Sequence, residues 1–298
     1  MAKKLKIGVI GMSEGNGHPY SWSAIFNGYE AKAMQDCPFP AIPDYLSQQN
    51  FPEDGLGESG KVTHIWTQDV EISKHIAAAA KIENIVDNLE DMIGEVDAIL
   101  LARDDAENHY EMAFPFLKAG LPIFIDKPLA LSVKEAQEIL KAQQYENQVF
   151  SCSSIRYADE LDLTLKEQDQ IGEIVHVEAA IPKKWDTYAI HLIEPIIARL
   201  PNRGKLIDIK SLHSDSISNC IVKWDNTTVY LKVTGKVPVL VNLKFYGENG
   251  VVKKDFKDSY NCFKKSLHKF VAIINGEEEN IDRRETLEII QILEEGRK

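Results

Sequence analysis

The sequence lacks any apolar run approaching the ~18 residues that a membrane-spanning helix requires. It begins MAKKLKIGVIG, which leads directly into a strand-like segment, without the apolar stretch and cleavage site of a signal peptide. We therefore expect a cytoplasmic protein with no membrane partner.

Cysteine is also scarce. The four cysteines stand far apart and form no CxxC pair; they are Cys37, Cys152, Cys220 and Cys262. This spacing suggests neither a zinc site nor a disulfide framework, so we expect reduced thiols and no bound metal.

Positive charge is scarce. The sequence has 34 Lys and Arg residues and 46 Asp and Glu residues, so its net charge is −12. No stretch of the sequence forms a basic patch, and even the pair Lys253 and Lys254 has acidic neighbours. A negative chain repels nucleic acid and anionic membranes, so we expect neither as a partner.

The chain does contain a regular alternation of elements. Its 298 residues, 44% hydrophobic and 27% charged, suffice for two domains of ordinary size. In the first half, compact apolar runs predict strands, and the amphipathic segments between them predict helices. The strands are predicted at 6–10, 61–69, 97–102, 122–125 and 149–153, and the helices at 72–80, 107–119 and 133–144. This rhythm predicts an α/β fold with a doubly wound parallel sheet.

The glycine motif after the first strand is incomplete. Gly11 closes the strand, but Ser13 occupies the place of the second glycine in a G-x-G-x-x-G fingerprint. One interpretation is a turn into a helix that begins near Ser21 as N-cap. The other is that Gly11, Met12 and Ser13 still cradle phosphates, with the loop around His18 reaching over a ligand.

Residues 35–60 interrupt the alternation with four prolines and three glycines. We expect an insertion with one helical turn near residues 45–49, either a binding loop or a surface excursion. The strand at 61–69 then ends near Thr67, where an acidic residue would bind the ribose of NAD. Thr67 permits NADP, with Lys74 as a partner for the extra phosphate, whereas Asp69 could itself hold the ribose of NAD.

Residues 121–130 read LPIFIDKPLA. The apolar run 122–125 suits a short buried strand, and Pro128 ends it because proline cannot donate to a sheet ladder. Proline also disfavours helix at the preceding residue, so we expect Lys127 at the carboxyl edge of the sheet, where such sheets bind ligands. The alternative is a solvated lysine in a loop.

The second half changes character. Residues 205–256 alternate polar and apolar positions between turns, which predicts an antiparallel meander with one exposed face. Helices are predicted at 260–275 and at 283–295, the latter with Asp282 as N-cap. His191 lies in an apolar segment with helical spacing, typical of a buried core histidine or of a site residue. Arg156 is either a surface ion pair or a ligand contact.

Three stretches in this order resemble one family. They are the glycine-closed first strand, the segment DAILLARDDAENHYEMAFPFLKAGLPIFIDKPLA, and the later segment WDTYAIHLIEPI. Together they are similar to the glucose-fructose oxidoreductase and inositol dehydrogenase (Gfo/Idh/MocA) family. Asn108 and His109 match the start of the family's histidine-bearing helix, residues 126–128 match its lysine motif, and His191 matches its catalytic histidine.

The resemblance implies a Rossmann domain over residues 1–127, with the insertion at 35–60, and an α+β domain over 128–298 with an open-faced sheet for substrate binding and oligomerisation. It implies an NAD- or NADP-dependent oxidoreductase that acts on a secondary alcohol of a sugar, sugar derivative or cyclitol, as a homodimer or homotetramer. The implied residues are Lys127 and His191 for catalysis, Gly11, Met12, Ser13, Thr67, Arg103 and Lys127 for the cofactor, and Arg156 for the substrate. Trp185 and Tyr188 flank His191, where they either pack on a sugar ring of the substrate or belong to the core, the commoner place for aromatic residues near a histidine.

The chain also departs from the family pattern. The family's aspartate four residues before the histidine is Thr187 here, its glycine is Ala189, and Asp186 is displaced by one residue. One residue rotates a helical side chain by about 100°, so Asp186 does not take the same geometry directly. Two other functions therefore stay open: a redox-neutral epimerase or glycosidase that uses the nicotinamide transiently, and a non-catalytic dinucleotide or sugar sensor.

Overall fold

The computed structural model describes residues 4–298, so the first three residues of the chain lie outside it. Contacts within the chain divide it into two compact units. Unit 1 holds the chain up to Leu129, then Gln137–Cys152 and Phe263–Ile281. Unit 2 holds Ala130–Ala136, Ser153–Cys262 and Asp282–Lys298. The domain boundary expected between residues 127 and 128 stays a prediction. Each compact unit contains more than one segment of the chain.

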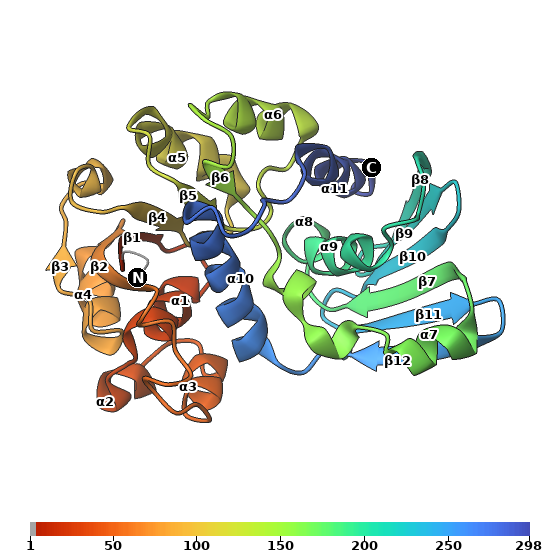
Figure 1. The fold of residues 1–298 in the computed structure, drawn as a ribbon, viewed down its shortest axis with the longest axis horizontal. Coiled ribbons are helices and arrows are strands. Elements are labelled where there is room, and N and C mark those ends of the chain that lie inside the picture. The colour runs from red at the N-terminus through yellow and green to blue at the C-terminus, as the bar shows by residue number, and fades with distance from the viewer. Residues whose placement is uncertain (1–3) are drawn as a thin grey trace. The chain divides into compact units, whose positions relative to one another are not determined.

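Unit 1 is built on a six-stranded sheet in the order β3-β2-β1-β4-β5-β6, in which every pairing is parallel (Figure 1). The strands are β1 (Leu5–Gly11), β2 (Gly60–Thr67), β3 (Asn84–Ile85), β4 (Ala98–Leu101), β5 (Ile123–Ile125) and β6 (Val149–Phe150). β4 and β5 are buried along their whole length, as apolar runs between two helical layers require. The predicted doubly wound parallel sheet is confirmed.

Helices connect these strands. They are α1 (His18–Asn27), α2 (Ala31–Gln35), α3 (Ala41–Leu46), α4 (Val70–Ala79), α5 (His109–Lys118) and α6 (Val133–Lys141). Helix α10 (Ser259–Ile274) comes after the second sheet in the chain and packs on β5 and β6 through Phe270. The predicted start of the first helix near Ser21 is wrong. Helix α1 begins three residues earlier after Gly17, because Pro19 suits the first turn, where its missing N–H is not needed.

The segment 35–60 packs onto unit 1. The helical turn predicted at 45–49 lies earlier in the structure, as helix α3, and Ile42, Leu46 and Met34 of α2 are buried. Phe39 and Ile42 sit so close to Gly17 that a Cβ there would lie 2.6 Å from each side chain. The segment is therefore anchored beside the start of α1.

Helix α10 was assigned from sequence to the second domain, but its residues from Phe263 onward belong to unit 1. Phe270 lies 5.7 Å from Phe124 of β5 and stacks on Phe150 of β6 at 6.1 Å between ring centroids. These aromatic contacts explain the placement of α10 in unit 1, because they bury its apolar face against the parallel sheet.

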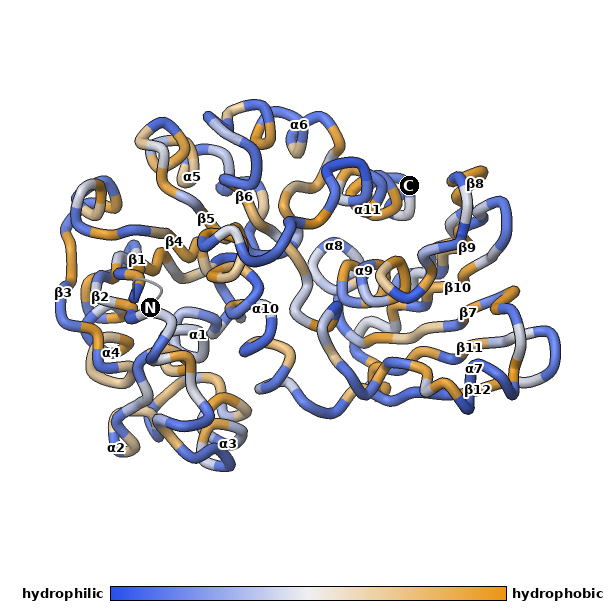
Figure 2. The backbone as a smooth tube through the Cα atoms, viewed as in Figure 1, coloured by the Kyte–Doolittle hydropathy of each residue, from blue (hydrophilic) through white to orange (hydrophobic). Residues whose placement is uncertain are grey.

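Unit 2 holds a second six-stranded sheet in the order β12-β11-β7-β10-β9-β8. The strands are β7 (Ile174–Ile181), β8 (Leu206–His213), β9 (Ser218–Trp224), β10 (Thr228–Val233), β11 (Asn242–Gly247) and β12 (Gly250–Asp255). The predicted continuous meander is wrong at one place: β7 lies between β10 and β11 and is parallel to β10. Figure 2 shows the mixed hydropathy along these strands, which leaves one face exposed.

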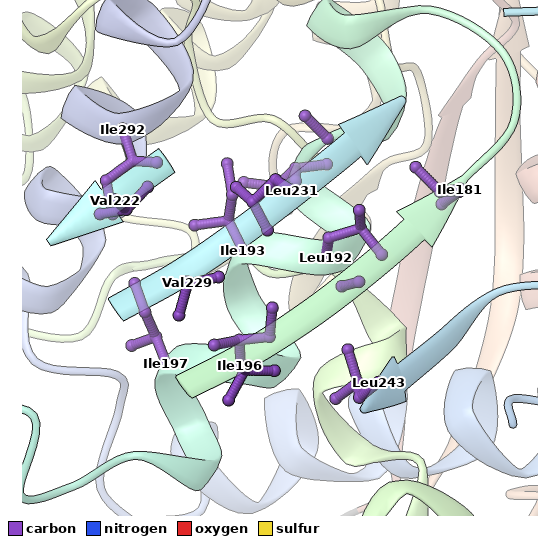
Figure 3. Packing of buried hydrophobic residues seen from close by; sticks show 14 of the residues in the cluster. Ile181, Leu192, Ile193, Ile196, Ile197, Val222, Val229, Leu231, Leu243 and Ile292 are labelled. Carbon is purple, nitrogen blue, oxygen red and sulfur yellow. The ribbon is translucent and has the colours of Figure 1, made fainter. Parts of the chain in front are cut away.

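The other face of this sheet carries the core of unit 2. Helix α9 (Ile190–Arg199) lays Ile193, Ile196 and Ile197 against β10, and α11 (Arg283–Glu295) adds Ile292 (Figure 3). The short helices α7 (Leu165–Ile171) and α8 (Trp185–Tyr188) complete the unit. The predicted N-cap of α11 is confirmed, because the Asp282 carboxylate accepts from the Arg284 N–H at 2.6 Å. No helix within residues 4–298 is both long and apolar enough to cross a membrane.

Candidate active site

The carboxyl ends of β1, β4 and β5 bring three polar side chains of unit 1 together. The Ser13 hydroxyl donates to Asp104 Oδ1 at 2.6 Å, and Lys127 Nζ lies 3.3 Å from Asp104 Oδ2. Ser13 and Lys127 are buried, at 6% and 4% exposure. The structure thus places Lys127 at the edge of the sheet, beside the loop that follows Gly11.

The charge on Asp104 is stabilised by these neighbours. Burial by itself raises the pKa of this carboxyl, but Lys127, the Ser13 hydroxyl and His18 together outweigh it and leave the pKa below its usual value. Asp104 is therefore ionised at neutral pH and forms an ion pair with the Lys127 ammonium.

Asp126, fully buried next to Lys127, ties the glycine-rich loop to β5. Its carboxylate accepts from Lys127 N and from Asn16 Nδ2, each at 2.8 Å, and lies 2.5 Å from His18 Nδ1. The His18 ring stacks on Trp22 at 4.8 Å. Sequence reasoning noticed His18 in the loop but missed its bond to Asp126, since the two residues are far apart in the chain.

A second cluster closes the edge between β1, β2 and β4. Arg103 bonds both carboxylate oxygens of Asp105 at 2.9 and 2.5 Å, and its Nη1 donates to Gln68 Oε1 at 2.9 Å. The Gln68 carboxamide in turn accepts from Met12 N at 3.1 Å and donates to Met12 O at 2.6 Å. Gln68 was missed, although its place directly after a strand was a usable signal.

His109, matched to the family's helix start, is fully buried. Its Nδ1 lies 3.1 Å from Leu129 O and its Nε2 lies 2.8 Å from Arg103 O. Both ring nitrogens therefore join the loop after β4 to the segment after Lys127, which indicates a structural role.

The end of β2 bears on the choice of dinucleotide. The Thr67 hydroxyl is buried and bonds Asp69 O at 2.6 Å and Ser73 Oγ at 2.8 Å. Asp69 is exposed and caps α4 through the Glu71 N–H at 2.9 Å, while Lys74 pairs with Glu71 at 2.7 Å. The bonds of Thr67 favour a structural role for it, and they leave Asp69 as the acidic group at the strand end.

The edge fits a dinucleotide. A Cβ on Gly11 would lie 2.4 Å from Pro19 Cγ, so only glycine lets the start of α1 approach the end of β1 this closely. The ten-residue helix α1 has no acidic residue in its first turn, so its N-terminus suits a diphosphate. No group of three metal-binding side chains occurs within residues 4–298.

In unit 2, His191 stands at the beginning of α9. Its Nδ1 lies 2.7 Å from the Ser153 hydroxyl, and its ring meets the Tyr188 ring edge-on at 5.4 Å. Asp186, the displaced aspartate, accepts from Arg297 Nε at 2.5 Å. The partner of His191 on this side is thus a hydroxyl.

Trp185, predicted to face the substrate, lies in the core of unit 2. It is 6% exposed, and its indole N–H donates to Leu293 O at 2.9 Å. A buried and bonded indole has little surface to offer a ligand, so its placement favours a packing role.

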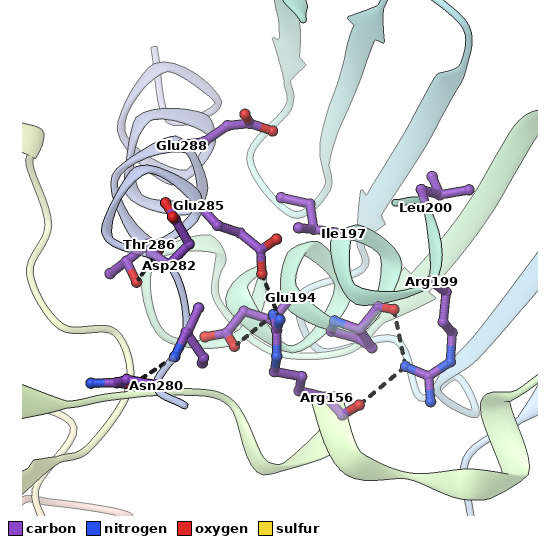
Figure 4. Close-up of polar contacts among 12 residues, drawn as sticks. Arg156, Glu194, Ile197, Arg199, Leu200, Asn280, Asp282, Glu285, Thr286 and Glu288 are labelled. Atoms are coloured by element: carbon purple, nitrogen blue, oxygen red, sulfur yellow. Dashed lines mark hydrogen bonds and ion pairs between the residues drawn. The ribbon is translucent and has the colours of Figure 1, made fainter. Parts of the chain in front are cut away.

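Arg156 lies in a buried ion network (Figure 4). Its guanidinium is 2.5 Å from Glu285 and 3.9 Å from Glu194, whose Oε1 accepts from Ser153 N at 2.8 Å. Burial raises the pKa of Glu194 to about 8, although Arg156 opposes the shift. This network favours a structural role for Arg156, and it identifies Glu194, one turn after His191, as a residue that sequence reasoning missed.

Comparisons with known proteins agree with this geometry. A family model described as "Oxidoreductase family, NAD-binding Rossmann fold" matches residues 5–154, about half of the chain. A search of curated proteins by sequence found no significant match.

Solved structures similar to this one include three dehydrogenases. UDP-N-acetylglucosamine 3-dehydrogenase GnnA from Acidithiobacillus ferrooxidans has a TM-score of 0.72 and 13% identity, covering 99% of this chain and 97% of the other. The scyllo-inositol dehydrogenase from Lactobacillus casei has a TM-score of 0.70 and 13% identity, and the match covers 99% of this chain and 96% of the other. The myo-inositol 2-dehydrogenase from Lactobacillus plantarum has a TM-score of 0.69 and 17% identity, and the match covers 99% of this chain and 96% of the other. At these identities the similarity shows a common fold.

Proposed function

The chain belongs to the oxidoreductase family with an NAD-binding Rossmann fold, and from this membership we propose that it transfers hydride between NAD and a secondary alcohol of a sugar, sugar derivative or cyclitol. The family makes the protein an NAD-dependent dehydrogenase that acts on alcohol groups. The carbohydrate-like substrate is supported by the similar structures, which are two inositol dehydrogenases and a dehydrogenase of a sugar nucleotide.

One observation carries the assignment of the site. A buried lysine, Lys127, lies at the carboxyl edge of a parallel sheet with the ionised Asp104 and the Ser13 hydroxyl. Ligands of open α/β sheets bind at this edge. Gly11, Met12, Ser13 and the start of α1 would hold the diphosphate, and a bound nicotinamide supplies the acceptor for hydride.

Oxidation of a secondary alcohol needs a base for the hydroxyl proton and a donor that stabilises the alkoxide. We assign the alkoxide donor to the Lys127 ammonium, which Asp104 holds in place. Proton removal is assigned to the His191 imidazole, whose Nδ1 is bonded to Ser153.

The dinucleotide is proposed to be NAD rather than NADP. The exposed carboxylate of Asp69 suits a ribose hydroxyl and repels a 2′-phosphate, and Lys74 is already paired with Glu71. Thr67, considered from sequence as the group that permits NADP, is bonded within the protein.

We also propose a homo-oligomer that forms through the exposed face of the unit 2 sheet. Leu212 of β8 and Ile221 of β9 are 74% and 50% exposed, an unusual exposure for large apolar side chains on a sheet. Sedimentation measurements test this, and a strictly monomeric protein at micromolar concentration would contradict it.

The function is tested with two measurements on the purified protein. Mass spectrometry identifies any dinucleotide that remains bound, and NADH absorbance follows oxidation of myo-inositol, scyllo-inositol and UDP-N-acetylglucosamine. We expect NAD to bind and at least one of these three compounds to be oxidised. Turnover without any change in NADH would instead support the redox-neutral alternative, and NAD binding without turnover of any sugar would support the sensor.

A further inference from the structure

The strand ends of unit 2 gather lysines that are distant in the sequence. Strands β7 and β10 are parallel neighbours, with Ile181 opposite Val233, so the loops that follow them meet at one edge. Lys183 and Lys184 follow β7, and Lys236 follows β10. The Lys183 N–H donates to Gly235 O at 2.7 Å, which joins the two loops. We call these three exposed residues the lysine edge.

The lysine edge lies beside the candidate base. The Lys183 ammonium donates to the Tyr188 hydroxyl and sits 4.2 Å from the centroid of the Tyr188 ring. The same ring meets His191 edge-on at 5.4 Å. Lys183, Tyr188 and His191 thus form one continuous row of side chains.

The backbone at Lys183 supports a functional role. Its φ is +75°, a conformation that glycine adopts readily and L side chains rarely do. Such residues concentrate at ligand sites, where the surrounding structure holds them in place. Here the hydrogen bond from the Lys183 N–H to Gly235 O holds the backbone in this conformation. The position carries a lysine, although a glycine would adopt the conformation more readily.

The charge of the edge stands out against the rest of the chain. Among the ion pairs within residues 4–298, Lys183, Lys184 and Lys236 have no carboxylate partner, although the chain carries twelve excess negative charges. The acidic groups close by are Asp186, which Arg297 neutralises at 2.5 Å, and Asp215, whose turn packs against Gly235. The lysine edge therefore remains net positive.

We propose that the lysine edge binds an anionic group of the substrate, a carboxylate or a phosphate, so that the proposed dehydrogenase acts on a negatively charged sugar rather than on a neutral polyol. This inference rests on the proposed function for the identity of the reacting alcohol. Lys183 contacts the anion, and Lys184 and Lys236 add attraction that salt screens. The reaction itself is unchanged, and only the selection of substrate depends on this edge.

The test compares four probes by calorimetry at low ionic strength: glucose, glucuronate, glucose 6-phosphate and UDP-N-acetylglucosamine. At least one charged probe is expected to bind about tenfold more tightly than glucose, the effect of one charge-assisted hydrogen bond. Glucuronate against glucose 6-phosphate distinguishes a carboxylate from a phosphate. The preference should disappear in a Lys183→Met, Lys236→Met double variant, survive in Lys183→Arg, and be unchanged in the control Lys118→Met.

Three results would overturn the proposal: no charged probe binding more tightly than glucose, the double variant retaining the preference, or the control variant losing it. Melting temperatures of all variants establish that they are folded. NAD binding is measured separately on the same samples. If the wild-type protein does not bind NAD, the proposed function is wrong. The comparison of charged probes with glucose would still be interpretable in that case.

Discussion

The two units each bury a cation beside carboxylates, but the carboxylates behave in opposite ways. At the edge of unit 1, Asp104 has its pKa lowered, since Lys127, the Ser13 hydroxyl and His18 outweigh its burial. Inside unit 2, burial raises the pKa of Glu194 to about 8 and repulsion from Glu285 adds to the shift, which the Arg156 guanidinium at 3.9 Å and the Ser153 N–H oppose without cancelling it. Burial alone therefore does not decide the charge; the number and distance of partners do.

This difference separates a ligand site from a structural one. The Lys127 pair lies at a strand edge where ligands bind, and its charges serve chemistry. The Arg156 network lies among α9, α11 and the chain after β6, where Glu285 already pairs with the guanidinium at 2.5 Å. Substitutions in the first cluster should change rates, and substitutions in the second should change stability.

A large loss of stability is expected for Arg156→Met. Removing the cation takes from the half-buried Glu285 its partner at 2.5 Å and from the buried Glu194 the charge that opposes its burial, which destabilises by about 3 kcal/mol or more. The matched control is Arg297→Met, whose ion pair with Asp186 is more exposed and contributes at most ~1 kcal/mol. Chemical denaturation measures both, and equal losses in the two variants would contradict the difference in burial.

Glu194→Gln is expected to change how stability depends on pH. The folded state keeps the Glu194 proton up to about pH 8, whereas the unfolded chain releases it near 4.5. The unfolded state then binds fewer protons between these values, so the wild-type protein loses stability as pH rises through this window, by on the order of 4 kcal/mol. Denaturation at pH 5 and pH 9 measures the loss.

In the Gln variant this loss should be absent, and Glu178→Gln, at an exposed position, is the matched control. If wild type and Glu194→Gln lose the same free energy of unfolding between pH 5 and pH 9, the carboxyl is ionised in the folded protein. The proposed difference between an ionised Asp104 and a protonated Glu194 would then be wrong.

Asp69→Asn is expected to have the smallest effect. Removing the carboxylate removes its repulsion toward a 2′-phosphate, so the preference for NAD over NADP should fall about tenfold, the effect of ~1.4 kcal/mol. Binding of both dinucleotides is measured by calorimetry, with Thr67→Val as a comparison. If the preference for NAD over NADP changes more in the Thr67 variant, then Thr67 rather than Asp69 contacts the ribose.

The sequence predicted what local patterns determine. Apolar runs located β1, β4 and β5, Pro128 placed Lys127 at a strand end, and Asp282 identified the start of α11. Alternation shows which face of a strand is buried but not which strands are neighbours, so the position of β7 between β10 and β11 was missed.

Parts of the candidate site depend on contacts between distant residues, which spacing does not contain. The bonds of Asp126 to His18 and of Gln68 to Met12 each join segments that only the fold brings together. The same holds for the lysine edge, because Lys236 meets Lys183 only through the pairing of β7 with β10.

The central claim is that the Lys127 ammonium acts in catalysis, and one comparison tests it directly: the rate of NADH formation and the melting temperature of Lys127→Met beside those of wild type. We predict a fall in kcat of roughly 10²–10⁴-fold in a variant that is still folded and binds NAD, with a lower melting temperature because Asp104 loses its buried partner. A variant that keeps the wild-type rate, or that loses activity only because it unfolds, would contradict the account.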